Sequence, residues 1–218
     1  MRVMHATVSQ PKPGRQNDAV GMGVEAGKLL TRHGADDCRL LLAGPAGEAS
    51  GTHVFIAQFQ SWEAYGACAD ELEQDHELEV LMDRLTREDS PLTFLSQAIG
   101  VELALDRKST AGRGHVVEVY ISRVLPGRFE AALELASDVF DYVERGGAVN
   151  TQVAMQTLAG SMTDTLVASW ELPNNRTLGK LGDSYMKEPD GQAIMARLTG
   201  AEAPITTIAS GVYTDIPI

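Results

Sequence analysis

Apolar positions recur along the chain with two periods, one typical of strands and one of helices, in a regular order. Residues 116–122 alternate as in a strand, and Leu125-Pro126-Gly127 interrupts the alternation. Two strands are predicted within 149–171, then a second helical region and a last strand over 204–215. The resulting order, βαββαβ, is that of the ferredoxin-like unit. The first helix of the unit has an apolar face formed by Phe129, Leu133, Ala136, Phe140 and Val143.

The same order occurs twice, because the first half of the chain resembles the second. Three segments recur 113 positions later and in the same order. Chance similarity between short apolar segments explains one such match but not three at a common offset. We therefore predict two fused copies of one unit. The matching segments are Pro13-Gly14-Arg15 with Pro126-Gly127-Arg128, 81–86 with 194–199, and Pro91-Leu92-Thr93 with Pro204-Ile205-Thr206.

The boundary between the copies is predicted from a change in pattern. Residues 106–114 lack apolar periodicity and are expected to form a flexible connector. The expected domains are a first ferredoxin-like repeat over 1–108 and a second over 114–218. A four-stranded antiparallel sheet with both helices on one face leaves its other face uncovered, so two such sheets can close on each other. The predicted fold class is α+β, with tandem repeats whose antiparallel sheets face each other as a pseudo-dimeric α/β barrel.

The alternation within the first strand of each copy predicts which side chains enter the space between the sheets. An apolar set that begins at Met4, and recurs 113 positions later, suits the helix side. The intervening residues would then point into a cavity between the sheets. There, pseudo-symmetry sets His5 opposite Glu118 and Thr7 opposite Tyr120.

This placement makes His5, Glu118 and Tyr120 candidate catalytic residues. A histidine beside a carboxylate can act as a general base whose tautomer the carboxylate fixes. The other interpretation is that these are ordinary polar residues that line a hydrated interface between sheets. Gln152 and Gln156 are candidate ligand contacts, because neutral amides can orient a ligand through hydrogen bonds.

The other candidate ligand contacts are Thr7, Phe59 and Trp170. Residues 56–59 best resemble 167–170, which predicts a two-residue slip from the common offset. The slip puts Phe59 and Trp170 in matching places near the ends of two strands. Large aromatic side chains there either form the wall of a ligand pocket or belong to the hydrophobic core.

A cluster of charge and two cysteines raise the question of a metal. Within 70–79, six carboxylates surround His76, which fits either a metal site or a solvated face near a helix start. These side chains would spread around a helix, so we expect no metal. Cys38 and Cys68 have no counterparts in the second copy and are expected to be reduced. No glycine-rich phosphate loop lies between a strand and a helix, and we expect no cofactor.

The formal net charge of −12 narrows the range of partners. It is spread over both halves and would repel the phosphate backbone of nucleic acids. No apolar run is long enough to span a bilayer, and the N-terminus lacks the apolar core of a signal peptide. We therefore expect a cytoplasmic protein with a small-molecule ligand and no nucleic-acid or membrane partner. The expected assembly is a monomer with an internal pseudo-dimer, or a homodimer.

Motifs at matching places in both copies resemble a known superfamily. They are Lys12-Pro13-Gly14-Arg15 before a helix, the segment 53–65, and their counterparts Leu125-Pro126-Gly127-Arg128 and 166–171. The chain resembles the dimeric α/β barrel superfamily, and most closely its antibiotic biosynthesis monooxygenase and NIPSNAP-like branches. The resemblance implies a cavity-forming barrel. Many members carry a histidine where this chain has Cys68. A haem-binding member would need an axial ligand facing the cavity, and nothing in the sequence requires haem.

Two functions follow from this resemblance. The first is a cofactor-independent monooxygenase-like enzyme acting on a phenolic or apolar substrate, in which a base such as His5 removes a proton and the anion reacts with oxygen. The second is a non-catalytic ligand-binding or scaffold barrel. A deep pocket with His5 on its floor would favour the enzyme.

Overall fold

The computed structural model describes residues 1–218 and repeats one series of elements twice. Each half has four strands and three helices, because the second helical region is split into two helices. The first half contains β1 (Val3–Pro11), α1 (Gln16–Arg32), β2 (Asp37–Ala43), β3 (His53–Phe59), α2 (Trp62–Leu72), α3 (His76–Thr86) and β4 (Leu92–Glu102). The second contains β5 (Val116–Val124), α4 (Phe129–Arg145), β6 (Val149–Leu158), β7 (Thr165–Leu172), α5 (Asn175–Lys187), α6 (Pro189–Thr199) and β8 (Ile205–Ile216). A short 3₁₀ turn precedes the third strand of each half, at Gly47–Ala49 and Gly160–Met162.

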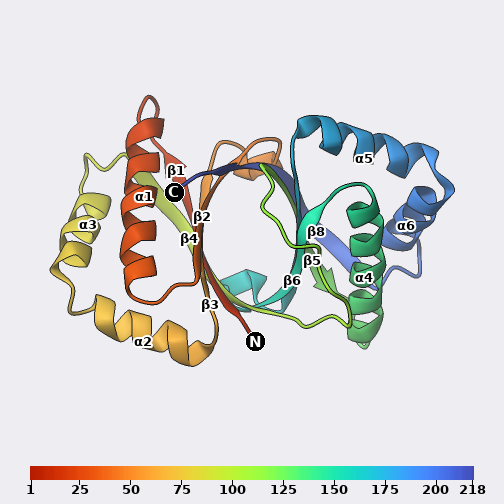
Figure 1. The fold of residues 1–218 in the computed structure, drawn as a ribbon, viewed down its shortest axis with the longest axis horizontal. Helices are drawn as coiled ribbons and strands as arrows, with labels where there is room; N and C mark the ends of the chain where they lie inside the picture. The colour runs from red at the N-terminus through yellow and green to blue at the C-terminus, as the bar shows by residue number, and fades with distance from the viewer.

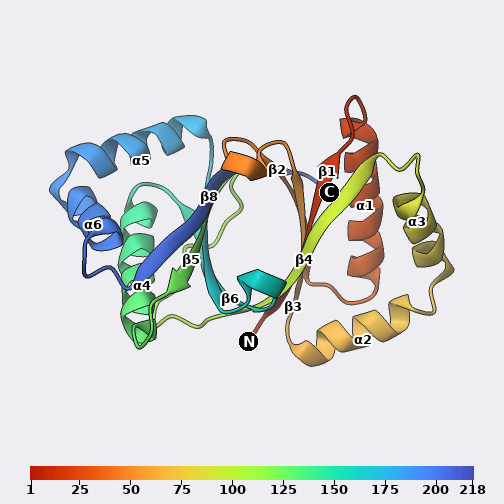
Figure 2. The same ribbon diagram turned by 180° about the vertical axis from the view of Figure 1, so that it is seen from behind.

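The eight strands form one closed antiparallel barrel in the order β1-β3-β2-β8-β5-β7-β6-β4. Two seams join the halves: β2 pairs with β8, and β4 pairs with β6. Figures 1 and 2 show the barrel in the middle, with α1 to α3 outside one wall and α4 to α6 outside the opposite wall. The predicted fold of facing ferredoxin-like sheets is confirmed. None of the helices combines the length and apolar character that crossing a membrane requires.

The offset of 113 residues holds through every element, so the predicted two-residue slip is wrong. The sheet pairs His5 with Ala57, and 113 positions later it pairs Glu118 with Trp170. Ser61 caps α2 by accepting a hydrogen bond from the amide of residue 64, and Asn174 caps α5 in the same way from residue 177. The true counterpart of Trp170 is therefore Ala57, and that of Phe59 is Leu172. The alignment by residue type was wrong because the aromatic residues of β3 and β7 lie at different positions along the two strands.

The predicted orientation of the first strands is also wrong. His5 and Thr7 face the helices, where they line a cavity together with residues of α1 and α2. Because side chains alternate along a strand, Met4, Ala6 and Val8 point into the barrel. Both faces of β1 are largely shielded from water, one by helices and the other by the barrel interior, although β4 and β8 are exposed over 93–97 and 206–210. An apolar set therefore fits either face, and alternation alone cannot assign it.

The connector between the halves is held in place, although its sequence predicts flexibility. The guanidinium of Arg107 donates hydrogen bonds to Asp141 and to Thr151. Thr110 donates to Glu144 through both its amide and its hydroxyl group. The connector is thus fastened to α4 and β6 of the second half.

Candidate functional site

A cavity of about 350 Å³ lies in the first half, between the sheet and the three helices. Its floor is the outward face of β1 and β3, including His5, Thr7 and Ala57. Apolar side chains of α1, α2 and α3 cover it, and it opens between α3 and β4, where Met82 and Phe94 are 41% and 39% exposed. A concave, mostly apolar site with a few polar groups is typical of small-molecule binding. The predicted cavity between the two sheets is thus replaced by one between sheet and helices.

His5 is the main ionisable group on the floor of this cavity. Its ring makes an edge contact with Tyr65, with 5.9 Å between ring centroids. Burial lowers the pKa of the imidazole below its ordinary value of 6.5. His5 is therefore mostly neutral at pH 7 and can accept a proton. Its cross-strand neighbour Ala57 is small, and both residues line the cavity together with Tyr65.

His53 is a second histidine in the same cavity, and it was not among the site residues predicted from the sequence. It is 1% exposed, its Nε2 lies 2.7 Å from the side-chain nitrogen of Gln16, and its Nδ1 has no partner. Burial lowers the pKa of His53 as well. The signal in the sequence was its position, since His53 is in phase with the buried residues Ala57 and Phe59 on β3.

The second half has a smaller cavity, of about 230 Å³, in the equivalent place between sheet and helices. Trp170 stacks on Tyr120, with ring centroids 5.1 Å apart and planes 18° from parallel. The indole Nε1 donates a hydrogen bond of 2.7 Å to the carboxylate of Glu118. Burial raises the pKa of Glu118, and raises that of Tyr120 to about 12. No histidine lines this cavity.

The structure therefore divides the predicted site residues among three places. His5, Thr7 and Phe59 line the first cavity, and Tyr120 and Trp170 line the second, where Trp170 binds Glu118. The predicted pairing of His5 with Glu118 is wrong, because each faces the helices of its own half and the barrel lies between them. The third place is the barrel interior, which contains Gln152 and Gln156.

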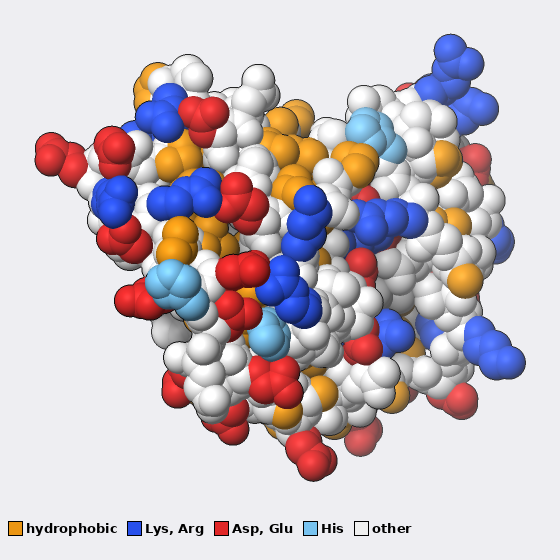
Figure 3. All heavy atoms as spheres, turned by 60° about the vertical axis from the view of Figure 1, so that its left-hand side comes forward, with side chains coloured by type: hydrophobic (Ala, Val, Ile, Leu, Met, Phe, Trp, Pro, Cys, Tyr) orange, Lys and Arg blue, Asp and Glu red, His pale blue; other side chains and the backbone are white.

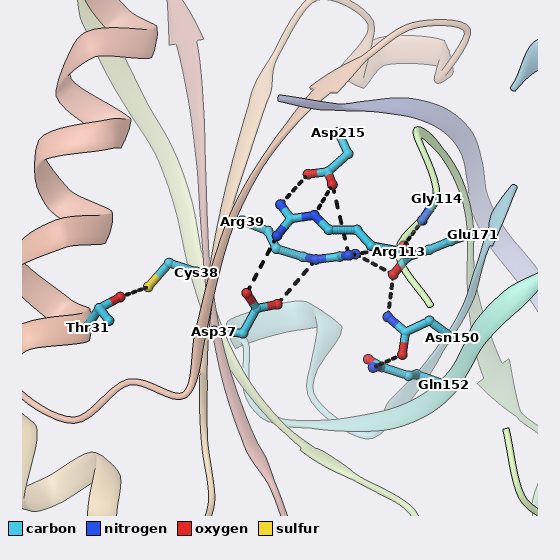
Figure 4. A network of polar contacts seen from close by, with 10 residues as sticks. All are labelled: Thr31, Asp37, Cys38, Arg39, Arg113, Gly114, Asn150, Gln152, Glu171 and Asp215. Carbon is cyan, nitrogen blue, oxygen red and sulfur yellow. Dashed lines mark hydrogen bonds and ion pairs between the residues drawn. The ribbon is translucent and has the colours of Figure 1, made fainter. Parts of the chain in front are cut away.

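A buried ionic network occupies the barrel interior near Gln152 (Figure 4). Arg39 of β2 forms a two-pronged ion pair with Glu171 of β7, and Arg113 forms another with Asp215 of β8. Glu171 also accepts hydrogen bonds from the amide of Gly114, at 2.6 Å, and from the side chain of Asn150. Arg39 is 6% exposed and Glu171 is 2% exposed. The ion pair of Arg39 with Glu171 joins the two halves, while the buried Nε of Arg39 has no hydrogen-bond partner and lies 3.3 Å from the carboxylate of Asp37.

The acidic segment 70–79 forms surface contacts. His33 lies between Glu71 and Asp75, at 3.0 and 2.7 Å, and these carboxylates raise its pKa. Figure 3 shows acidic and basic side chains intermixed on this side of the molecule, with hydrophobic atoms between them. No group of three or more histidine, cysteine or acidic side chains is arranged to hold a metal ion. Cys38 and Cys68 are free thiols, and both are buried.

The raised pKa of Glu118 predicts a gain in stability for Glu118→Gln. The folded protein disfavours the carboxylate, so the wild type loses stability as pH rises from the usual carboxyl pKa of 4.5 through the higher value of the folded state. Glutamine keeps an acceptor for the indole and has no proton to lose. The advantage of the variant should be smallest near pH 4 and should grow towards pH 7. Urea unfolding of both proteins across this range measures it, and a difference that does not change with pH would contradict the prediction.

A closed barrel of two ferredoxin-like halves is the dimeric α/β barrel fold, formed here within one chain. Solved structures with this fold cover almost the whole chain. An anthrone oxidase-like protein is 14% identical, with a TM-score of 0.63 over 99% of this chain and 92% of its own. A candidate monooxygenase from Fusobacterium nucleatum is 8% identical, with a TM-score of 0.60 over 99% and 93%. A mutant chlorite dismutase from Candidatus Nitrospira defluvii is 9% identical, with a TM-score of 0.53 over 98% and 91%. No protein-family model and no curated protein matches the sequence.

Proposed function

We propose that the protein is a cofactor-independent oxygenase whose substrate, an apolar aromatic compound with an acidic hydrogen, binds in the first cavity. The supporting observation is His5, a neutral imidazole without a hydrogen-bonding partner in the protein, on the floor of a mostly apolar cavity. The shared fold with an anthrone oxidase-like protein and a candidate monooxygenase supports the same class of reaction.

His5 is the general base in this reaction. It takes a proton from an activated CH₂ group, and the resulting carbanion gives one electron to O₂. The two radicals combine to form a peroxide at that carbon, which recovers the proton. Removal of the second hydrogen as a proton breaks the O–O bond, so that the carbon becomes a ketone and the other oxygen leaves as water. The apolar walls exclude water and protect the carbanion from reprotonation.

Oxygen uptake with anthrone as the probe tests this proposal. His5→Gln should lower the rate by about 10²- to 10⁴-fold, the usual contribution of a general base. The matched control is His76→Gln, because His76 is an exposed histidine outside the cavity and its loss should leave the rate unchanged. The wild-type kcat/KM should fall at low pH as His5 gains a proton, with the midpoint of the fall below the ordinary imidazole pKa of 6.5.

Two results would overturn parts of the proposal. Full activity in His5→Gln would remove His5 from its role as base. Tight binding of aromatic compounds without any oxygen uptake would instead establish a non-catalytic binding barrel.

A further inference from the structure

The two cavities are equivalent under the internal repeat. All but two of the residues lining the second cavity have their counterparts, 113 positions earlier, in the lining of the first. The exceptions are Phe140 and Thr199. The second half therefore shows how the same framework looks when its cavity is partly filled by the protein's own side chains.

The main filling group is the indole of Trp170. It lies beside Glu118, its cross-strand neighbour, and points its N–H at the carboxylate over 2.7 Å. One ring face stacks on Tyr120, and Phe140 meets it edge-on at 6.3 Å. A flat, fused bicyclic ring with one hydrogen-bond donor is thus held against the residue equivalent to His5.

The first half has small side chains in the corresponding places. Ala57 replaces Trp170 beside His5, and Thr7 replaces Tyr120. The aromatic residues of this strand are instead Phe55 and Phe59, on either side of Ala57, where the second half has Ala168 and Leu172. The cavity is larger than that of the second half, and His5, Ala57 and Phe55 all line it. Tyr65 of α2, where the second half has Leu178, meets the ring of His5 edge-on at 5.9 Å.

We propose that the substrate binds in the first cavity as Trp170 binds in the second, as a flat fused ring that lies over Ala57 and directs an acidic hydrogen at its edge, on oxygen, nitrogen or an activated CH₂ group, towards His5. This inference rests on the proposed function in one respect, namely that the substrate faces His5. Ala57 and Thr7 are then the residues that determine which ligands fit. The class of ligand is a fused aromatic compound of two or more rings with an acidic hydrogen at its edge, either an O–H or N–H donor as in 2-naphthol or an activated CH₂ group as in anthrone, and one molecule binds per chain.

Binding of 2-naphthol, measured by calorimetry without any turnover, tests the proposal. The wild type should bind one molecule per chain, and Ala57→Trp should raise the Kd at least a hundredfold, because the introduced indole occupies the place of the ligand. Naphthalene, which has no donor, should bind about tenfold more weakly than 2-naphthol to the wild type. His5→Ala should abolish that preference.

Weaker binding by Ala57→Trp could come from a blocked cavity or from a destabilised fold, and the two causes must be separated. A lower melting temperature for Ala57→Trp would indicate a strained core, so Thr7→Tyr serves as the second variant and should also weaken binding of 2-naphthol. The control is Ala168→Phe, which introduces a large side chain into the second cavity instead of the first and should leave the Kd unchanged. Wild-type affinity in both first-cavity variants, or loss of binding in Ala168→Phe, would overturn the proposal. Binding that behaves as expected without oxygen uptake would overturn only the proposed function.

Discussion

Arg39→Met is expected to destabilise the protein by about 3–5 kcal/mol, the usual cost of removing one partner of a buried ion pair. The change leaves the carboxylate of Glu171, which is 2% exposed, without its cation. Gly114 and Asn150 still donate hydrogen bonds to it, but neither carries a charge. Urea unfolding at pH 7, followed by circular dichroism, measures the loss.

The double variant Arg39→Met/Glu171→Gln should recover most of this loss, because the carboxylate of Glu171 is no longer present to be left unpaired. Its glutamine can still accept a hydrogen bond from Asn150 or from the amide of Gly114. Asp37 and Asp215, which also face Arg39, keep their ion pairs with Arg113. Arg84→Met provides the surface control: the pair of Arg84 with Glu25 is about half exposed and should contribute no more than about 1 kcal/mol. Equal unfolding midpoints for wild type and Arg39→Met would show that the network contributes little to stability.

Residues 1–108 alone should not form a stable monomer. The seams of β2 with β8 and β4 with β6 would be lost, and the inner barrel face, including Leu41 at 2% exposure, would meet water. The first half also has the weaker core, since its main cluster contains 7 buried residues and that of the second half contains 14. The fragment should therefore aggregate or self-associate, and it should show no cooperative transition as a monomer.

Size-exclusion chromatography with light scattering and urea unfolding of the fragment test this expectation. Co-expression of 1–108 with 109–218 is the control, because the two pieces together restore both seams and should assemble into a stable barrel. A monomeric first half with a sharp unfolding transition would contradict the prediction, and would make 1–108 an independent domain.

The fold could be predicted from the sequence, because a repeat at one offset can be recognised without knowing how the side chains pack. The Pro-Gly-Arg motifs illustrate this: Gly14 and Gly127 adopt φ of +75° and +72°, a conformation that favours glycine in both copies. Residue types gave the wrong alignment of the third strands, because an aromatic residue packs equally well at more than one position there. An aromatic residue on a buried strand fits at either of two successive outward positions, so Phe59 was matched to Trp170, although the ladder matches Trp170 to Ala57.

The candidate site was predicted only in part, for a related reason. His5, Thr7 and Phe59 do line one cavity, but which face of the strand they occupy depends on what covers that face. Tyr65 is the last residue of the 53–65 motif, and its ring contacts both His5 and Phe59. That contact depends on how α2 packs on the sheet, which no local pattern in the sequence specifies.

The position of the cavities outside the barrel has an evolutionary consequence. A barrel assembled from two identical chains must carry two identical sites, so every substitution that improves one site changes the other as well. Fusion of the two units removes this constraint, and the barrel wall keeps the cavities apart. In this chain one copy fills its hollow with Trp170 and Tyr120, which stack on each other, while the other has the larger cavity that His5 lines.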